Sequence, residues 1–157
     1  MPPAARLAIR PASVHDARAL HALIRGWERQ LVVDAAQADA FLATIDARTL
    51  AAICVDEAFR VLVAEDAGGV VGVIALRHGS HVFHWFTRRG REGQGVGGAL
   101  WRALLATIPD EVRRAGLTVN ASPGAVAIYR RLGFVETGPR VERDGIAWLP
   151  MRRAEPA

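Results

Sequence analysis

The amino-acid sequence predicts a mixed α/β or α+β fold built around one sheet of about seven strands. Three observations predict this fold class. Segments of strand length alternate along the chain with segments of helical periodicity. Two of the strand segments flank a glycine-containing turn, as the arms of a hairpin do. A glycine-rich stretch, residues 90–98, ends another strand segment and leads directly into an apolar helix.

The N-terminal third of the chain predicts one strand followed by helices. Residues 7–11 have the composition of a short strand that ends at a proline. Ser13 is in position to cap a helix over residues 14–27, because apolar side chains recur there at helical spacing. A second, alanine-rich helical stretch is expected over residues 34–52.

The middle of the chain predicts three strands in a meander and then a helix. Residues 59–65 and 70–77 flank the sequence Asp-Ala-Gly-Gly, whose glycines can adopt the positive φ of a hairpin turn. Residues 80–87 form a third, aromatic-rich strand segment. After the glycine-rich stretch, residues 96–108 have the apolar spacing of a helix.

The C-terminal third predicts a strand, a helix and two closing strands. The strand is expected over residues 115–122. The helix that follows has Ser122 in position to cap its N-terminus and Gly133 in position to end it. The closing strands are expected at residues 134–138 and 146–152, on either side of a turn.

The composition fits one globular domain and excludes several classes of protein. The chain has 157 residues, of which 51% are hydrophobic and 23% are charged, a balance typical of folded domains and not of disordered segments. Its apolar runs are too short to cross a bilayer, and its N-terminus lacks the apolar segment of a secretory signal. The single cysteine, Cys54, fits a reducing cytoplasm and excludes a cysteine-based metal site. We therefore expect a cytoplasmic protein with no membrane partner and no metal ion.

The charge pattern favours a local anion site over a nucleic-acid surface. The chain has no lysine, and acidic residues lie between most of its arginines, so the net charge is only +4. A face that binds nucleic acid would need a broad basic stripe, so no nucleic-acid partner is expected. The tightest arginine cluster comes directly before the glycine-rich stretch, where it could neutralise phosphates, and consists of Arg88, Arg89 and Arg91.

The glycine-rich stretch itself is typical of a phosphate site. The first backbone N–H groups of a helix have no partner within the helix, and the positive end of the helix dipole lies there. Glycines let a ligand approach this backbone closely. The stretch is neither a Walker A sequence, which needs a lysine, nor a dinucleotide-binding fingerprint, whose spacing and βαβ context differ. Its residues alone leave open a plain strand-to-helix connection without a ligand.

Two motifs resemble those of the GNAT superfamily of N-acetyltransferases. The first is the acetyl-CoA signature Gln/Arg-x-x-Gly-x-Gly/Ala between the fourth strand and a helix; Gly95 and Gly97 match its small positions, and Glu92 stands at its Gln/Arg position. The second lies on the helix after the fifth strand, where Ala-x-x-x-Tyr-x-x-x-Gly-Phe is matched by Ala125, Tyr129, Gly133 and Phe134. The resemblance extends over nearly the whole chain, from residue 9 to residue 153.

This resemblance implies one GNAT domain over residues 1–157, with a mostly antiparallel sheet of about six or seven strands, splayed between strands four and five, and about four flanking helices. It implies acetyl-CoA as the acyl donor. The pyrophosphate is expected on the turn amides and the pantetheine arm along the fourth strand, because its amides can extend a sheet edge. The residues assigned to this site are Trp85, Phe86, Thr87, Glu92, Gly93, Gln94, Gly95, Val96, Gly97, Gly98, Asn120, Ser122 and Tyr129.

The resemblance also implies direct transfer of the acetyl group to a primary amine. Tyr129 is expected to protonate the departing thiolate as the general acid. His81 is the preferred general base, ahead of His84, with Glu65 as a further candidate and bulk water as an alternative. Regular alternation over residues 81–87 would place the odd-numbered side chains on one face of the sheet and the even-numbered ones on the other.

Two other functions remain open from the sequence. One is a GNAT-fold sensor that binds CoA without catalysis, and Glu92 keeps it open because a carboxylate is unexpected beside a phosphate. The other is a fold relative that binds no cofactor and serves in protein interaction. The acceptor amine is not specified, and a homodimer is one arrangement that the resemblance suggests. Three aromatic residues are candidates to line an acceptor pocket: Trp27, Phe41 and Trp148.

Overall fold

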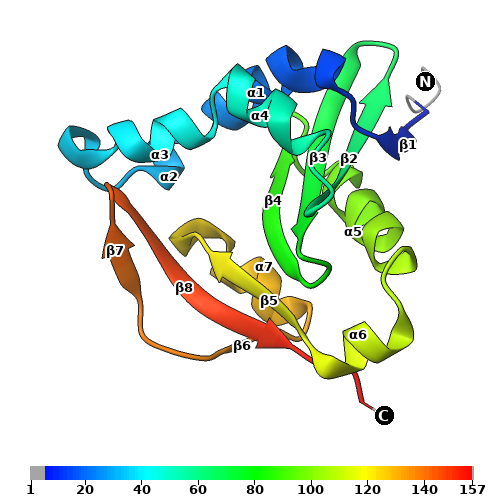
Figure 1. Ribbon diagram of the computed structural model, residues 1–157, viewed down its shortest axis with the longest axis vertical. Coiled ribbons are helices and arrows are strands. Elements are labelled where there is room, and N and C mark those ends of the chain that lie inside the picture. Colours follow the sequence, from blue (N-terminus) through cyan, green and yellow to red (C-terminus); the bar gives the residue numbers. More distant parts are fainter. Residues whose placement is uncertain (1–5, 157) are drawn as a thin grey trace.

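The computed structural model describes residues 6–156, which form an eight-stranded mixed sheet flanked by helices (Figure 1). The strands are β1 (Ala8–Pro11), β2 (Phe59–Asp66), β3 (Gly69–Arg77), β4 (His81–Thr87), β5 (Leu117–Ala121), β6 (Val135–Glu136), β7 (Val141–Arg143) and β8 (Ile146–Arg153). The helices are α1 (Ala17–Arg25), α2 (Glu28–Leu31), α3 (Asp39–Thr44), α4 (Ala47–Ile53), α5 (Val96–Ala106), α6 (Asp110–Ala115) and α7 (Val126–Arg131). The 3₁₀ turns are η1 (Val14–Asp16), η2 (Ala35–Gln37) and η3 (Pro123–Ala125).

The sheet has the strand order β1-β2-β3-β4-β5-β8-β6, and β7 pairs with the first residues of β8. The paired strands are antiparallel except β4 and β5, which run parallel. This parallel pairing joins only His81 to Thr118 and Val82 to Val119. Beyond Val82 the two strands separate, and Figure 1 shows β5 and β8 running at an angle to β4. The expected mixed α+β fold, splayed between the fourth and fifth strands, is therefore confirmed.

The first helical region begins as predicted but is broken before its expected end. Ser13 caps η1 in a capping box with Asp16, whose carboxylate accepts the Ser13 N–H at 2.8 Å. The helix expected over residues 14–27 runs on through α1 only as far as Arg25. The chain then turns at Gly26, and α2 forms a separate short helix.

The second helical region, expected over residues 34–52, is three short elements: η2, α3 and α4. Asp34 caps the expected start, since its side chain accepts the N–H of Ala36 at 3.1 Å. Asp46 begins a new helix within the region: its backbone is extended, and its side chain accepts the N–H of Thr49 at 2.8 Å. This cap satisfies a helix N-terminus in the middle of an alanine-rich stretch, so helical composition did not produce one long helix.

The C-terminal region contains two elements that the sequence did not predict. One is α6, and the other is β7, which turns into β8 through Asp144 and Gly145, both at positive φ. The strand expected over residues 134–138 is reduced to β6, so the sheet has eight strands and not about seven. Gly133 ends α7 at a φ of 92°, as expected. Ser122 occupies the N-cap position of η3, but its side chain makes no capping bond there.

A β-bulge overturns the expected alternation of side chains on β4. The register between β3 and β4 shifts between Ala75 and Leu76, which leaves Phe83 as the extra residue of the bulge. Phe83 consequently packs in the cluster beneath α1 and α4, as Phe86 does, although alternation puts these two residues on opposite faces. Val82 packs on the α5 side.

Two hydrophobic clusters cover opposite faces of the sheet. One unites β2, β3 and β4 with α5, α7 and β5, and the other packs α1 and α4 against β2 and β3. Helix α5 lies close to β3 because Gly72 has no side chain; a Cβ there would lie 2.6 Å from Cγ1 of Val96. This close packing fixes the N-terminus of α5 beside the end of β4. Within residues 6–156, no helix has the length and apolar character that a bilayer crossing requires.

Candidate active site

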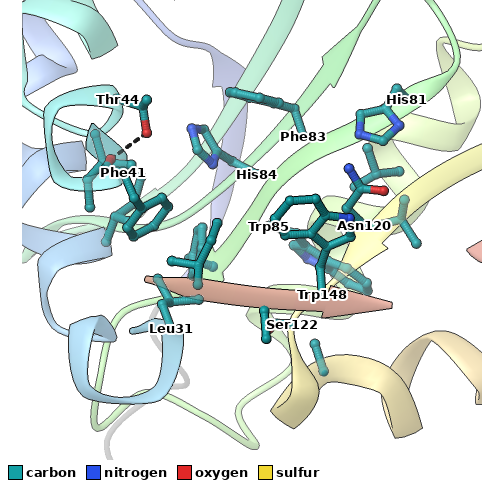
Figure 2. Close-up of a pocket in the computed structure, with 18 of the residues that line it drawn as sticks. Leu31, Phe41, Thr44, His81, Phe83, His84, Trp85, Asn120, Ser122 and Trp148 are labelled. Carbon is teal, nitrogen blue, oxygen red and sulfur yellow. Dashed lines mark hydrogen bonds between the residues drawn. The ribbon is translucent and has the colours of Figure 1, made fainter. Parts of the chain in front are cut away.

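Two cavities meet where β4 and β5 part. The first, of about 640 Å³, is lined by the glycine-rich turn, the end of β4 and α7, and we call it the turn cavity. The second, of about 580 Å³, is lined by β4, β5, the N-terminal helices and the β7–β8 hairpin, and we call it the hairpin cavity. Figure 2 shows part of the hairpin cavity, with His81 and His84 from β4 and Trp148 from β8. Residues that line both cavities include Trp85, Ser122 and Tyr129.

The glycine-rich turn holds a backbone conformation that leaves the N-terminus of α5 open. Gly90, Gly93 and Gly95 have φ values of 90°, 75° and 85°, a region that L side chains rarely adopt. Gly95 occupies the N-cap position and therefore supplies no side-chain acceptor to the first turn of α5. The unpaired N–H groups of this eleven-residue helix consequently face the turn cavity, where they can bind an anion.

Glu92 stabilises the turn through a backbone contact. Its Oε2 atom accepts the N–H of Gly90 at 2.7 Å, and its Oε1 atom lies 3.9 Å from Nε of Arg89. The carboxylate is thus held by the loop that precedes the glycines. An acidic residue at this position is compatible with an anion site, because the attraction to the anion comes from backbone N–H groups.

Two of the three clustered arginines also hold the turn in place. Arg91 donates to Oδ2 of Asp66 at 2.6 Å and to Oε1 of Gln94 at 2.7 Å, which ties the turn to the end of β2. The guanidinium carbon of Arg89 lies 4.9 Å from the centroid of the Trp27 ring. Gln94 is thus a turn-bracing residue in this structure, and it does not line the turn cavity.

The end of β4 presents backbone polar groups to the gap beside β5. Arg88 donates its N–H to the carbonyl of Val71 on the β3 side, and Phe86 is paired with Val73 in the same register. Because antiparallel pairing alternates, the N–H and C=O groups of Trp85 and Thr87 point away from β3 and toward the gap. The Thr87 carbonyl already accepts the indole N–H of Trp27 at 2.7 Å.

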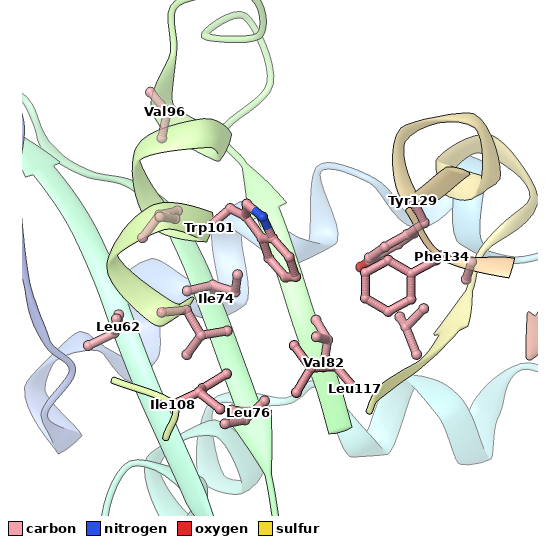
Figure 3. Packing of buried hydrophobic residues seen from close by; sticks show 14 of the residues in the cluster. Leu62, Ile74, Leu76, Val82, Val96, Trp101, Ile108, Leu117, Tyr129 and Phe134 are labelled. Carbon is pink, nitrogen blue, oxygen red and sulfur yellow. The ribbon is translucent and has the colours of Figure 1, made fainter. Parts of the chain in front are cut away.

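Tyr129 lies at the junction of the two cavities and is 6% exposed. Its ring makes edge contacts with Trp85 and Phe134, at centroid distances of 5.6 and 5.2 Å. Figure 3 shows Tyr129 packed against Phe134, with its hydroxyl oxygen directed to the side on which Trp101 lies. Burial raises the pKa of the Tyr129 phenol, so the group stays protonated at neutral pH.

The two histidines of β4 both line the hairpin cavity but differ in environment. Nδ1 of His81 lies 2.8 Å from Oγ1 of Thr118, and burial, with smaller effects of Arg77 and His78, lowers the pKa of His81. His84 is 9% exposed, and its Nε2 atom is buried without a hydrogen-bond partner among the described residues. Burial lowers the pKa of His84 to about 4. Both rings are therefore neutral at pH 7.

Other candidate groups lie away from both cavities. The Glu65 carboxylate binds Arg10 at 2.9 Å, which lowers the pKa of Glu65, and the side chain lines neither cavity. Cys54 follows α4, and burial raises the pKa of its thiol. Within residues 6–156, no group of three His, Cys, Asp or Glu side chains is arranged to hold a metal ion.

Most of the residues assigned to the acetyl-CoA site line the turn cavity. The exceptions are Gln94, which braces the turn, and Asn120, which lines the hairpin cavity beside His81. Of the three aromatic candidates for an acceptor pocket, two line the hairpin cavity, and Trp27 lines the turn cavity instead. Sequence reasoning did not single out Arg77, whose only signal is a charge at the end of the apolar run 70–76.

A model of the acetyltransferase (GNAT) domain matches residues 29–155 of the chain. The chain belongs to the GNAT acetyltransferase family. The matched residues begin within α2. In this GNAT protein they include the splayed strands β4 and β5, the glycine-rich turn and the helix that carries Tyr129. A comparison with curated protein sequences finds no match.

Solved structures of similar fold cover nearly the whole chain. A GCN5-related N-acetyltransferase from Rhodopseudomonas palustris is 25% identical, with a TM-score of 0.78, over 94% of this chain and 95% of its own. The PaiA N-acetyltransferase from Thermoplasma acidophilum, in complex with coenzyme A, is 12% identical, with a TM-score of 0.73, over 96% and 99%. A mutant of the spermidine N-acetyltransferase SpeG from Vibrio cholerae is 18% identical, with a TM-score of 0.60, over 93% and 92%.

The contact between Glu92 and Gly90 predicts different effects for two substitutions. Glu92→Gln keeps an oxygen that can accept the Gly90 N–H and removes a negative charge near the anion site, so CoA should bind more tightly, by about 1 kcal/mol or less. Glu92→Ala removes the acceptor as well, so the turn loosens and CoA should bind more weakly than in wild type. Isothermal titration with CoA measures both. Equal weakening by the two substitutions would contradict this account of the Glu92 side chain.

Burial of a neutral His84 predicts that the protein loses stability in mild acid. The folded-state pKa of His84 is about 4, against an ordinary value of 6.5, so the unfolded chain binds a proton that the folded chain does not. The stabilisation is complete above pH 6.5 and is lost as the pH falls toward 4, by about 3 kcal/mol in all. Urea unfolding across this pH range should show a smaller loss for His84→Gln. His78→Asn, at an exposed histidine, is the matched control and should keep the wild-type loss.

Proposed function

We propose that this protein transfers an acetyl group from acetyl-CoA directly to a primary amine of a small molecule or a protein. One observation carries the proposal: Tyr129 lines both cavities at the point where they meet. A donor bound in the turn cavity and an amine bound in the hairpin cavity would have their reacting atoms beside this phenol. Membership of the GNAT acetyltransferase family supports the same class of reaction.

The turn cavity has the groups that a CoA molecule needs. The backbone N–H groups of residues 93–98, at the open N-terminus of α5, can donate to pyrophosphate oxygens. The Trp85 and Thr87 backbone groups that face the gap can pair with the amides of the pantetheine arm, as an added strand pairs with a sheet edge. Phe86 and Ser122 line the same cavity and complete its walls along the proposed path.

The proposed reaction needs one acid and one base and no covalent enzyme intermediate. The amine nitrogen forms a bond to the acetyl carbonyl carbon, and the bond between that carbon and the CoA sulfur breaks. Tyr129 donates its phenolic proton to the departing sulfur, and its raised pKa ensures that this proton is present at neutral pH. His81 accepts the proton that the amine loses. Both residues then exchange protons with solvent, which restores their starting states.

His81 is the preferred base because its ring is neutral, only partly buried and positioned by a neighbour. Its contact with Thr118 orients one ring nitrogen, which leaves Nε2 for the amine proton. His84, with a pKa of about 4, holds a proton too weakly to serve well at neutral pH. Asn120 lines the hairpin cavity beside His81 and offers a further polar contact to the acceptor.

Removal of the Tyr129 hydroxyl should lower the rate of acetyl transfer. Tyr129→Phe keeps the ring that packs against Trp85 and Phe134, so CoA affinity should stay nearly the same. We expect kcat to fall roughly ten- to a hundred-fold, at the low end of general-acid effects, because a thiol of pKa near 8.5 is a fairly good leaving group. Thiol release with a panel of primary amines measures the rate, and calorimetry with CoA measures the affinity.

Two results of that experiment would contradict the proposed function. One is the absence of heat when wild-type protein is titrated with acetyl-CoA at millimolar concentration. The other is tight binding of acetyl-CoA with no thiol release for any amine, which is the behaviour of a CoA sensor. A large loss of CoA affinity in Tyr129→Phe, with the rate per bound complex preserved, would contradict the acid role alone.

Loss of the His81 imidazole should lower kcat roughly a hundred-fold, which is the low end for general-base catalysis. His81→Gln is the test, because glutamine is polar and uncharged but cannot take up the amine proton. Added imidazole should restore part of the rate. The control is His78→Asn, three residues away on an exposed turn and outside both cavities. An unchanged kcat in His81→Gln would transfer the base role to another group or to water.

A further inference from the structure

The lining of the hairpin cavity is mainly apolar and aromatic. Phe41, Phe83, Trp85 and Trp148 contribute rings from three separate parts of the chain (Figure 2). The charged side chains along this lining are two arginines and one aspartate: Arg77, Arg143 and Asp144. Because both histidines of the cavity are neutral at pH 7, the lining carries more positive than negative charge.

Arg77 differs from the other half-buried arginines of the described chain, which are Arg10, Arg91, Arg113 and Arg153. Each of those four forms an ion pair with an aspartate or a glutamate. Arg77 forms none with any carboxylate in residues 6–156, and its Nε atom is buried without a hydrogen-bond partner there. A partly desolvated guanidinium cannot lose its charge, so it favours a negatively charged partner strongly.

A second unsatisfied nitrogen belongs to another residue of the same cavity lining. In residues 6–156 only two buried side-chain nitrogen or oxygen atoms lack a hydrogen-bond partner: Nε of Arg77 and Nε2 of His84. Both residues belong to the hairpin-cavity lining. Buried polar groups in folded proteins are nearly always satisfied, so the described fold leaves its two exceptions on residues of this one cavity.

The Arg77 guanidinium lies near the point where β4 and β5 separate. Its central carbon is 5.0 Å from the centroid of the Phe83 ring, and Phe83 is the first residue of β4 beyond the parallel pairing. Arg77 is also paired across the β3–β4 register with His81, and its charge contributes to the lowered pKa of His81. A group bound by Arg77 would therefore lie close to the proposed general base.

We propose that the acceptor is an amine that also carries a carboxylate and a bulky apolar group, and that Arg77 binds the carboxylate. This is the chemistry of an aromatic or large aliphatic amino acid. The inference rests on the proposed function, since it assigns the acceptor of that same reaction. The Arg77 guanidinium donates two parallel hydrogen bonds to the carboxylate, which places the adjacent amine beside His81. The aromatic side chains of the cavity pack against the apolar group.

The same lining is unfavourable for a polyamine. A molecule with several ammonium groups needs several carboxylates, and among the residues that the structure describes this cavity offers only Asp144, which is exposed. The Arg77 charge would in addition repel an ammonium held at the strand junction. The chain thus differs in expected acceptor from the spermidine N-acetyltransferase whose fold it shares.

The test compares acceptors that differ by one group. The full chain is assayed with saturating acetyl-CoA and with L-phenylalanine, L-phenylalaninamide, phenethylamine or spermidine, and both thiol release and the N-acetyl product are measured. We expect kcat/KM for L-phenylalanine to exceed that for phenethylamine about a hundred-fold or more, because a site built to bind a polar group rejects an analogue that lacks it. The amide should resemble phenethylamine. This comparison uses wild-type protein and does not depend on the folding of any variant.

Variants then assign the effect to one side chain. Arg77→Gln should abolish most of the preference for L-phenylalanine, chiefly by raising KM. Arg77→Lys should retain part of the preference, because lysine keeps the positive charge but lacks the paired N–H donors of the planar guanidinium. Arg102→Gln, at an exposed arginine of α5 outside both cavities, should keep the full preference. Loss of the preference in Arg143→Gln, with its retention in Arg77→Gln, would overturn the role of Arg77.

The remaining outcomes separate this inference from the proposed function. If phenethylamine or spermidine is acetylated as well as L-phenylalanine, the acceptor inference is wrong and the proposed function stands. If no amine is acetylated, the proposed function is wrong, and calorimetry of the CoA-saturated protein with L-phenylalanine decides the ligand question. Binding that Arg77→Gln abolishes would support the carboxylate site, and no binding to wild-type protein would overturn it.

Discussion

The parallel pairing of β4 with β5 ends after two residue pairs, and the candidate site depends on where it ends. On its other edge β5 pairs with β8 over its full length, from Leu117 to Ala121, so only the β4 side is left open beyond Val119. The bulge at Phe83 falls just beyond the last pair and turns β4 away from its neighbour. The backbone groups of Trp85 and Thr87 are thereby left facing a gap. Without this separation the turn cavity and the hairpin cavity would not share Tyr129.

The walls of the hairpin cavity come from segments far apart in the sequence, and one glycine holds them together. The carbonyl of Gly145, in the β7–β8 turn, accepts the N–H groups of Val33 and Asp34 at 2.8 and 3.2 Å. A Cβ at Gly145 would lie 2.4 Å from the Asp34 carbonyl oxygen, so only glycine permits this approach. The N-terminal helices and the closing hairpin therefore form one wall, whereas the turn cavity is built mainly from a single local stretch. This difference explains why the turn cavity, the proposed donor site, follows a short motif and the hairpin cavity, the proposed acceptor site, does not.

The sequence predicted those features that are encoded locally. The hairpin at residues 59–77, the turn glycines and the position of Tyr129 in its helix each depend on a few neighbouring residues, and the family resemblance rests on the same residues. The prediction that side chains alternate regularly along β4 was wrong at Phe83, because a bulge depends on the partner strand. The prediction of one helix over residues 34–52 was wrong, because Asp46 adopts an extended backbone and caps a new helix there. Arg77 was missed since its distinguishing property, the lack of a carboxylate partner within residues 6–156, is a property of the folded chain.

Burial has opposite consequences for the ionisable groups at the strand junction. It keeps the Tyr129 phenol protonated and the His81 and His84 rings neutral, because each of these groups can avoid a buried charge by binding or releasing a proton. A guanidinium has no such option at any physiological pH. Carboxylates of the same chain compensate the charge of the other half-buried arginines, which are Arg10, Arg91, Arg113 and Arg153. Among residues 6–156 the fold supplies none for Arg77, and in our proposal the acceptor brings this counter-charge into the hairpin cavity.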